Sequence, residues 1–331
     1  MKETEVNQIF EKFQRMRVVI IGDSMVDVYL WGKVDRVSPE APIPIVSVTK
    51  RESRLGGAAN VSLNLQSLGA TPVLFSVVGD DDKGRKFRKM IEAKNLPGQG
   101  IFVDTERMTT VKSRIIGMGQ HIARVDEEST EIISTEIEQK LLRGISLELD
   151  SNKVDVIIFV DYDKGVITPS LIESVRKIAR EKNIPVAADP KLRNFPHYRD
   201  IDLFKPNLKE FMEGTGARVA KGDMEALRKA ACKLKENQNL KLIFITLSEM
   251  GVFISNGIQE QYYPAVIRHI ADVSGAGDTV ISVACLAMAA KIPINIMALM
   301  ANIAGGLVCE LPGVVPVDKE RLIQVMKSQK L

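Results

Sequence analysis

The sequence predicts an α/β fold organised on a mostly parallel sheet, and three observations lead to it. Apolar stretches of strand length alternate with stretches of helical period along most of the chain. The stretch from Val156 to Val160 is apolar at every position, which is typical of a strand buried on both faces of a parallel sheet. Polar clusters follow successive apolar strands, so ligand groups should gather along the carboxyl edge of one sheet.

The apolar pattern also places the individual elements. An amphipathic helix over residues 3–16 opens the chain and is expected to dock on the surface. Strands are expected at residues 17–21, 72–78, 156–160, 185–188, 201–204 and 241–246. Helices are expected just after Gly56-Gly57 and at residues 83–94, 135–149, 169–182, 223–236, 276–290, 294–308 and 318–328.

Two further segments do not fit the parallel sheet and predict a smaller one. The segment Arg36–Pro44 holds three prolines, which exclude a central strand and indicate an edge ribbon or flap. Residues 110–116 and 121–125 alternate around Gly117-Met118-Gly119, which predicts a hairpin able to join that ribbon.

Composition and charge bound the class of protein. The chain has 331 residues, 45% hydrophobic and 26% charged, which suits one large α/β unit or two domains. The net charge of +3, from 45 basic and 42 acidic residues, argues against a dedicated nucleic-acid protein. Three widely spaced cysteines indicate neither a disulfide framework nor a zinc site. With no signal peptide and no apolar run of membrane-spanning length, we expect a cytoplasmic protein without a membrane partner.

The chemistry centres on the segment Asp272–Thr279, which reads Asp-Val-Ser-Gly-Ala-Gly-Asp-Thr. Gly275, Ala276 and Gly277 are small enough for backbone N–H groups to approach an anion, and the helix expected there adds the positive end of its dipole. They predict an anion hole for a phosphate. Asp278, in the first helical turn, is the candidate base that takes a proton from an attacking hydroxyl. An ordinary capping aspartate after a glycine turn is the alternative, and these residues alone leave it open.

A second group of candidates follows the first strand and opens the next helix. Asp27 is placed to bind sugar hydroxyls. Gly56 and Gly57 let a ligand approach the backbone, and Asn60 offers both a donor and an acceptor. A tight helix start explains the same glycines without a ligand, and that alternative also stays open.

Together these residues resemble the ribokinase-like (pfkB) carbohydrate kinases. Gly56-Gly57 with Asn60 resembles the N-terminal signature of that family, and Asp272–Asp278 resembles the C-terminal one, with Ser274 where threonine is commoner. The resemblance runs from about Arg17 to the C-terminus. No P-loop motif is present, and no third glycine follows to complete a dinucleotide-binding motif.

The resemblance implies a fold and a domain organisation. The fold would be a ribokinase-like three-layer α/β/α sandwich with a central, mostly parallel sheet and a small β-sheet lid. Residues 1–331 would form a single kinase domain behind an N-terminal helix at residues 1–16. The lid would be discontinuous, from about 30–52 and 109–126, and in this family it often makes a dimer contact, which implies a homodimer.

Within the family, five segments resemble the D-glycero-β-D-manno-heptose 7-phosphate kinases, which phosphorylate C1 on the way to ADP-heptose for lipopolysaccharide. These segments are Arg36–Pro44, Leu55–Asn60, Asp161–Gly165, Asp189–Lys191 and Lys205–Glu210. No His-x-Gly-His of a nucleotidyltransferase is present, so the resemblance implies the stand-alone kinase. Asp163 stands where that group more often has a small residue, which leaves the exact sugar less fixed than the kinase class.

By this resemblance the site residues take specific roles. Asp278 would be the base on the anomeric hydroxyl, with the backbone of Gly275–Gly277 as the anion hole. ATP and Mg²⁺ are the implied cofactors, with Asn207 and Glu210 positioning the magnesium largely through water. Ser248 and Gly251 would lie near the nucleotide, with Asn302 by the adenine. The sugar would be held by Asp27, Gly56, Gly57 and Asn60. A monovalent cation is implied near Asp272 and Ser274.

A substrate that already bears a phosphate also needs cations around it. The candidates are Arg36, Arg114, Arg124, Lys164, Lys191 and Arg193. A solvated surface role is the alternative for each.

Two other functions stay open beside the heptose kinase. One is a kinase of the fructokinase or ribokinase type, acting on another sugar or sugar phosphate. The other is a non-catalytic sugar-phosphate sensor on the same fold, which would have no need of a base such as Asp278.

Overall fold

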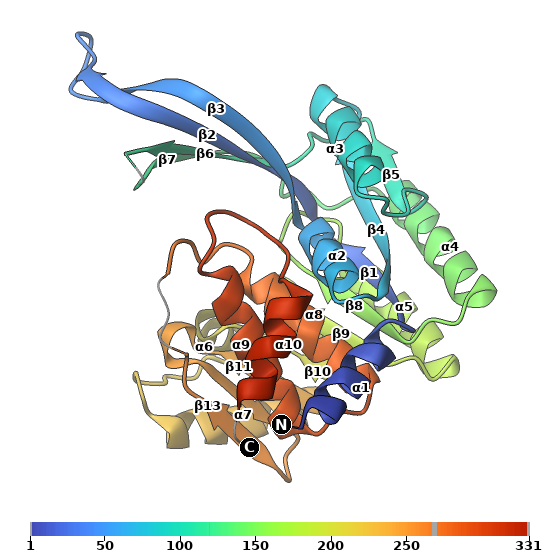
Figure 1. Cartoon of the computed structure of the whole chain (residues 1–331). Coiled ribbons are helices and arrows are strands. Elements are labelled where there is room, and N and C mark those ends of the chain that lie inside the picture. Colours follow the sequence, from blue (N-terminus) through green and yellow to red (C-terminus); the bar gives the residue numbers. More distant parts are fainter. Residues whose placement is uncertain (1, 119, 267–269, 330–331) are drawn as a thin grey trace.

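The structure is a computed structural model that describes residues 2–118, 120–266 and 270–329. Within these residues, nine strands form one sheet in the order β13-β12-β11-β10-β9-β8-β1-β4-β5. The strands from β11 to β5 are parallel, whereas β12 and β13 are antiparallel and close one edge (Figure 1). The strand bounds are β1 Arg17–Gly22, β4 Thr71–Gly79, β5 Ile101–Asp104, β8 Val156–Val160, β9 Val186–Asp189, β10 Leu203–Phe204, β11 Leu242–Thr246, β12 Val252–Ser255 and β13 Glu260–Tyr263.

Helices cover both faces of this sheet. On one face lie α1 Glu3–Phe13, α2 Ala58–Ser67, α3 Asp82–Ala93, α8 Ala276–Ala289, α9 Ile294–Val308 and α10 Lys319–Ser328. On the other lie α4 Thr135–Ser151, α5 Pro169–Glu181, α6 Leu208–Thr215 and α7 Met224–Gln238. This is a three-layer α/β/α sandwich, so the predicted fold class is confirmed.

Strand β1 shows why the sheet is buried on both faces. Val18 and Ile20 pack into one hydrophobic core, and Val19 and Ile21 pack into the other. Successive side chains of a strand point to opposite faces, so an unbroken apolar run supplies two cores at once.

The end of β1 is the point at which the order of the sheet reverses. The chain continues from β1 toward β4 and β5 on one side, and the later strands are added on the other side. Asp23 follows β1 there and accepts bonds from the backbone N–H groups of Tyr162, Lys164 and Val166. Ligands bind at such switch points in open α/β sheets.

A four-stranded lid, ordered β3-β2-β6-β7, rises from this edge and projects away from the body (Figure 1). Its strands are β2 Ser24–Val37, β3 Pro44–Gly57, β6 Val111–Gly117 and β7 Gln120–Glu127. The prolines of the ribbon lie in the hairpin turn and at the first residue of β3, an edge strand, so the predicted flap and hairpin do form one sheet. Gly119, part of the predicted hairpin turn, lies outside the described residues.

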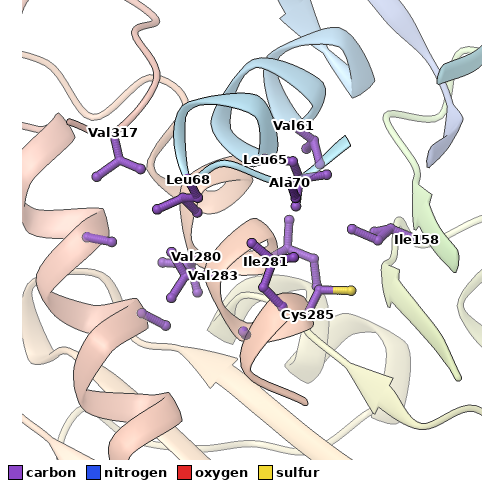
Figure 2. Packing of buried hydrophobic residues seen from close by; sticks show 14 of the residues in the cluster. Val61, Leu65, Leu68, Ala70, Ile158, Val280, Ile281, Val283, Cys285 and Val317 are labelled. Carbon is purple, nitrogen blue, oxygen red and sulfur yellow. The ribbon is translucent and has the colours of Figure 1, made fainter. Parts of the chain in front are cut away.

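The packing of α2 on α8 positions the site. Figure 2 shows Val61 and Leu65 of α2 close to Ile281 of α8, with Ile158 of β8 beside them. All four side chains are fully buried. This contact fixes the start of α2, which carries Asn60, against the start of α8, which carries Asp278.

The sequence pattern missed several elements. It did not predict β5, β12, β13 and α6, all of eight residues or fewer, nor the full length of β2. Short edge strands carry too few residues for periodicity to appear. β2 runs for 14 residues, and the half nearer the tip of the lid is exposed or half-buried, so no continuous apolar stretch marks it.

No helix in the described part of the chain is long and apolar enough to span a bilayer.

Candidate active site

The turn before α8 has the geometry of an anion site. Gly275 is the N-cap of α8 with φ 82°, a left-handed conformation that favours glycine. The first N–H groups of a helix have no partner within it, and its dipole is positive at this end. Ala276 N–H makes only a long 3.3 Å bond to Val273 O. The turn therefore offers backbone donors to an anion.

Asp278, in the first turn of α8, is buried and held from two sides. Asn60 Nδ2 donates to Asp278 Oδ2 at 2.8 Å. Tyr162, from the segment after β8, donates its hydroxyl to Asp278 Oδ1 at 2.6 Å. Each carboxylate oxygen is thus fixed by one donor and keeps acceptor capacity for a substrate hydroxyl.

The environment of Asp278 suits a base. Burial raises the pKa of its carboxyl to about 6, while the hydrogen bonds from Asn60 and Tyr162 oppose that rise. At neutral pH the carboxylate is therefore mostly ionised, yet basic enough to accept a proton from a hydroxyl.

Asp27 and Arg114, both predicted to bind substrate, form a buried ion pair at the base of the lid. A Cβ on Gly56 would come within 2.0 Å of Asp27 Oδ2, so the glycine is required by the close approach of this carboxylate. Gly57 has φ 59° and leads into α2. These residues, with Asn60, lie on the lid side of the switch point, where the sequence predicted the sugar.

A second charged cluster follows β9 and β10. Lys205, with only 3% of its side chain exposed, pairs with Asp189 at 3.0 Å. Its Nζ lies 3.8 Å from where a Cβ on Gly277 would be, so a buried cation faces the anion-hole turn. Lys191 forms an ion pair with Glu210. Burial alone would lower the pKa of Lys191, but Asp189 and Glu210 raise it.

Asn207 and Glu210 form a capping box at the start of α6. Glu210 N donates to Asn207 Oδ1 at 2.9 Å, and Asn207 N donates to Glu210 Oε2 at 2.8 Å. No cluster of three metal-ligating side chains occurs in residues 2–118, 120–266 and 270–329. These side chains suit a magnesium ion that arrives with phosphates and keeps its waters, as Mg²⁺ commonly does.

Two of the predicted nucleotide residues, Asn302 and Gly251, border the backbone at Tyr263 and Pro264. Asn302, on α9, donates to Pro264 O at 2.9 Å. Gly251 has φ 96°, and a Cβ there would come within 2.0 Å of Tyr263 O. Ser248 also has a positive φ of 53° in the short turn after β11. Ser248 follows the carboxyl end of β11, and Gly251 and Pro264 lie at the same edge of the sheet, where β12 begins and β13 ends.

One predicted residue, Arg36, is placed differently from the rest. Arg36 is exposed near the tip of the lid, nine residues beyond Asp27 on β2, which is roughly 30 Å at the rise of a strand. Within a single subunit, Arg36 therefore does not reach Asp278. Lys164 lies at the lid base, paired with Glu128 at 2.8 Å. Asp163 has φ 57° and pairs with Arg193 at 2.8 Å.

Sequence reasoning assigned no role to Tyr162 and Lys205, although both lie in segments that it singled out. The available signal was their position directly after buried strands, in the same clusters as Asp161 and Asn207. Which side chain of such a cluster turns toward the base depends on tertiary packing.

A groove of about 750 Å³ lies at the opposite edge of the sheet, near the amino ends of β9 and β11. Its lining includes Lys177, Arg180 and Lys291, which lie at or just beyond the carboxyl ends of α5 and α8. Cations there complement the negative end of a helix dipole, so ordinary helix chemistry accounts for them.

Comparisons with known proteins agree with this geometry. A family model described as "pfkB family carbohydrate kinase" matches residues 15–320. The chain is 38% identical over its whole length to the "Bifunctional protein HldE" of Syntrophotalea carbinolica, covering 67% of that relative. It is 39% identical to the protein of the same name from Geotalea uraniireducens, over 93% of this chain and 62% of that relative. The chain thus spans about two thirds of the length of these curated relatives.

Solved structures show the same fold at low identity. Phosphofructokinase-2 from Escherichia coli, in complex with substrates and products, has a TM-score of 0.79 and 15% identity, over 94% of this chain and 98% of that one. Ribokinase of Arabidopsis thaliana, complexed with ribose and ATP, has a TM-score of 0.71 and 17% identity, over 95% and 99%. At these identities the likeness concerns the fold alone.

Proposed function

Since this chain belongs to the pfkB family of carbohydrate kinases, we propose that it phosphorylates D-glycero-β-D-manno-heptose 7-phosphate at the C1 hydroxyl, with ATP as the donor. The product would be the heptose 1,7-bisphosphate. That the protein is an enzyme that phosphorylates a sugar follows from the family. The particular sugar rests on the heptose-kinase-like segments and on the similarity to proteins named HldE.

The observation that carries the proposal is the pair of hydrogen bonds on Asp278. They come from Asn60 and Tyr162, which belong to two of the segments that resemble heptose 7-phosphate kinases. In the proposed reaction the C1 hydroxyl donates to Asp278, which takes its proton as the oxygen attacks the γ-phosphorus and the bond from that phosphorus to the leaving ADP breaks. Alignment of the hydroxyl and the phosphate supplies much of the rate, because phosphoryl transfer needs positioning more than covalent help.

Charge stabilisation comes from the other side of the site. The backbone N–H groups of Gly275–Gly277 would bind the transferring phosphoryl group, with the dipole of α8 behind them. Lys205 faces the same turn and would add a full positive charge in a buried place. Mg²⁺ would supply further neutralisation of the ATP phosphates, held through water by Asn207 and Glu210. Ser248, Gly251 and Asn302 would border the nucleotide.

The phosphate already on the sugar would lie toward the lid. Arg114 and Lys164 are the predicted cations on that side, each paired with a carboxylate in the present structure. Lys191, in contrast, lies with Glu210 and suits the ATP phosphates better than the sugar phosphate. A monovalent cation near Asp272 stays a prediction. A comparison of the activity in potassium with the activity in sodium tests it.

We place a second copy of the chain on the lid. Its exposed apolar side chains include Val37, Ile43, Val48, Met118 and Val125, each at least half exposed. A thin sheet that exposes several apolar side chains favours a partner that covers them. A homodimer through the lid would also bring the exposed tips, with Arg36, against the neighbouring subunit. We also expect the proposed reaction to take place in the cytoplasm, because its donor is ATP.

The test is ADP release with magnesium-ATP on four sugars. D-glycero-β-D-manno-heptose 7-phosphate is compared with fructose 6-phosphate, ribose and fructose, and the product is identified by phosphorus NMR. We expect a strong preference for the heptose phosphate and a 1,7-bisphosphate product. Turnover of another sugar alone would reject the heptose assignment and keep the kinase. Absence of turnover with every sugar would favour a sensor.

A further inference from the structure

The loop at residues 312–314, between α9 and α10, is held by two side chains of the lid; we call it the clamp loop. Arg54 of β3 donates from Nη1 to Pro312 O at 2.8 Å and to Val314 O at 3.1 Å. Tyr29 of β2 accepts a bond from Val314 N at 2.8 Å. The Tyr29 bond is buried and the Arg54 bond to Val314 O is partly buried, whereas the Arg54 bond to Pro312 O is exposed.

Glycine is required in the middle of the clamp loop. Gly313 has φ 73°, and a Cβ there would come within 2.7 Å of Arg54 Nη1 and 2.8 Å of Tyr29 Cζ. The backbone conformation and the close approach of both side chains therefore exclude any larger residue. No motif in the sequence marks this loop.

The clamp loop also holds the anion-hole turn. Gly313 N donates to Asp272 Oδ2 at 3.0 Å, while Ser274 N donates to Asp272 Oδ1 at 2.9 Å. A Cβ on Gly275 would lie 3.4 Å from Val314 Cγ1, so turn and loop are in contact. Movement of the loop would therefore move the donors that open α8.

Tyr29, which helps to hold the clamp loop, also contacts the Asp27–Arg114 ion pair at the base of the lid, which we call the sugar-side pair. The ring of Tyr29 carries the Arg54 guanidinium 4.9 Å from its centroid and the Arg114 guanidinium 5.3 Å away. Arg114 in turn pairs with Asp27. Both cation–π contacts involve a fully buried tyrosine, where they are stronger than at an exposed site.

We propose that Arg54 is a positioning residue for phosphoryl transfer, which holds the anion-hole turn in register with the sugar-side pair through the clamp loop. The inference rests on the proposed anion hole at Gly275–Gly277. A planar guanidinium can bind two carbonyls and stack on a ring at once, which a lysine cannot do. A continuous chain of hydrogen bonds and packed side chains then links the lid to the turn.

Arg54→Ala tests the proposal, with kcat and KM measured on whichever sugar the wild type accepts best. We expect kcat to fall about tenfold to a hundredfold, the effect of roughly 1 Å of misplacement, with a smaller change in the KM for sugar. Millimolar guanidinium should restore part of the activity. Arg54→Lys should be intermediate. Gly313→Ala should reproduce the loss without altering Arg54.

Arg199→Ala is the matched control. Arg199 also donates to a backbone carbonyl, Pro196 O at 3.3 Å, but it lies in the turn before the amino end of β10. The kcat of Arg199→Ala should stay at the wild-type value and should not respond to guanidinium. If Arg54→Ala does not fold, Arg54→Lys and Gly313→Ala carry the test.

Two outcomes overturn the proposal: a kcat for Arg54→Ala within about twofold of wild type, or a loss that guanidinium leaves unchanged and Gly313→Ala does not reproduce. Wild-type turnover tests the proposed function, because the absence of turnover with every sugar would reject it. The ratio of the kcat of each variant to the kcat of the wild type tests the role of Arg54 alone.

Discussion

Replacing Tyr162 by phenylalanine removes one hydroxyl and leaves the ring in place. That hydroxyl donates to Asp278 Oδ1 at 2.6 Å, a short bond to an ionised acceptor. The bond favours the carboxylate over the carboxylic acid and so lowers the pKa of Asp278 against the effect of burial. Tyr162→Phe should therefore raise that pKa.

The size of the effect follows from the strength of the bond. A hydrogen bond to a charged group contributes about 1.5–3 kcal/mol, and about 1.4 kcal/mol corresponds to one pKa unit. The pKa of Asp278, about 6 in the wild type, should then lie between about 7 and 8. At pH 7 the ionised fraction falls from about nine tenths to between about one half and one tenth. We expect kcat/KM at pH 7 to fall about twofold to tenfold and to recover by about pH 9.

The assay is a profile of kcat/KM from pH 5 to 10, in which the acid limb reports the base of the free enzyme. Tyr198→Phe is the matched control, because Tyr198 donates to Asp161 Oδ2 at 3.1 Å in the same part of the molecule. Burial raises the pKa of Asp161 to about 6 as well, so this control separates the two carboxylates. An acid limb that stays in place in Tyr162→Phe, or moves equally in Tyr198→Phe, would refute the reasoning.

Defined results are expected for three further variants. Asp278→Asn should abolish turnover while calorimetry still detects nucleotide binding; full activity would exclude Asp278 as the base. Because the folded pKa of Asp278 is raised from 3.8 to about 6, its ionised form destabilises the fold above about pH 6, and this penalty disappears below about pH 4. Asp278→Asn should therefore raise Tm at pH 8, and the gain should shrink as the pH falls from 6 to 4. Asp27→Asn leaves Arg114 buried without its charged partner, so urea unfolding should show a loss of about 3–5 kcal/mol, with a higher KM for sugar. Val48→Glu puts a charge on the exposed lid face and should shift sedimentation from dimer to monomer, whereas a wild-type monomer would exclude the lid contact.

Much of the fold could be read from local pattern. The sequence predicted the strand Val156–Val160 at its observed bounds, because an unbroken apolar run of strand length is typical of a strand buried on both faces. The prolines of residues 36–44 marked the lid hairpin because proline cannot serve a central strand. The motif at Asp272–Thr279 predicted the candidate base and the glycine turn that the structure shows at the start of α8, since a run of small residues before a helix and a carboxylate in its first turn are local features.

The sequence by itself thus determined most of the elements, the parallel sheet with its lid, and most of the candidate residues of the proposed site. Only the tertiary structure decided how those residues pair. Asn60 and Tyr162 meet Asp278 across 218 and 116 positions of sequence, because α2 packs on α8 beside β8. Arg36 lies at the tip of the lid and Lys191 beside Glu210, although both were predicted around one substrate phosphate. Periodicity reports which face of an element is buried, whereas pairing between distant elements depends on packing and register, which no local pattern encodes.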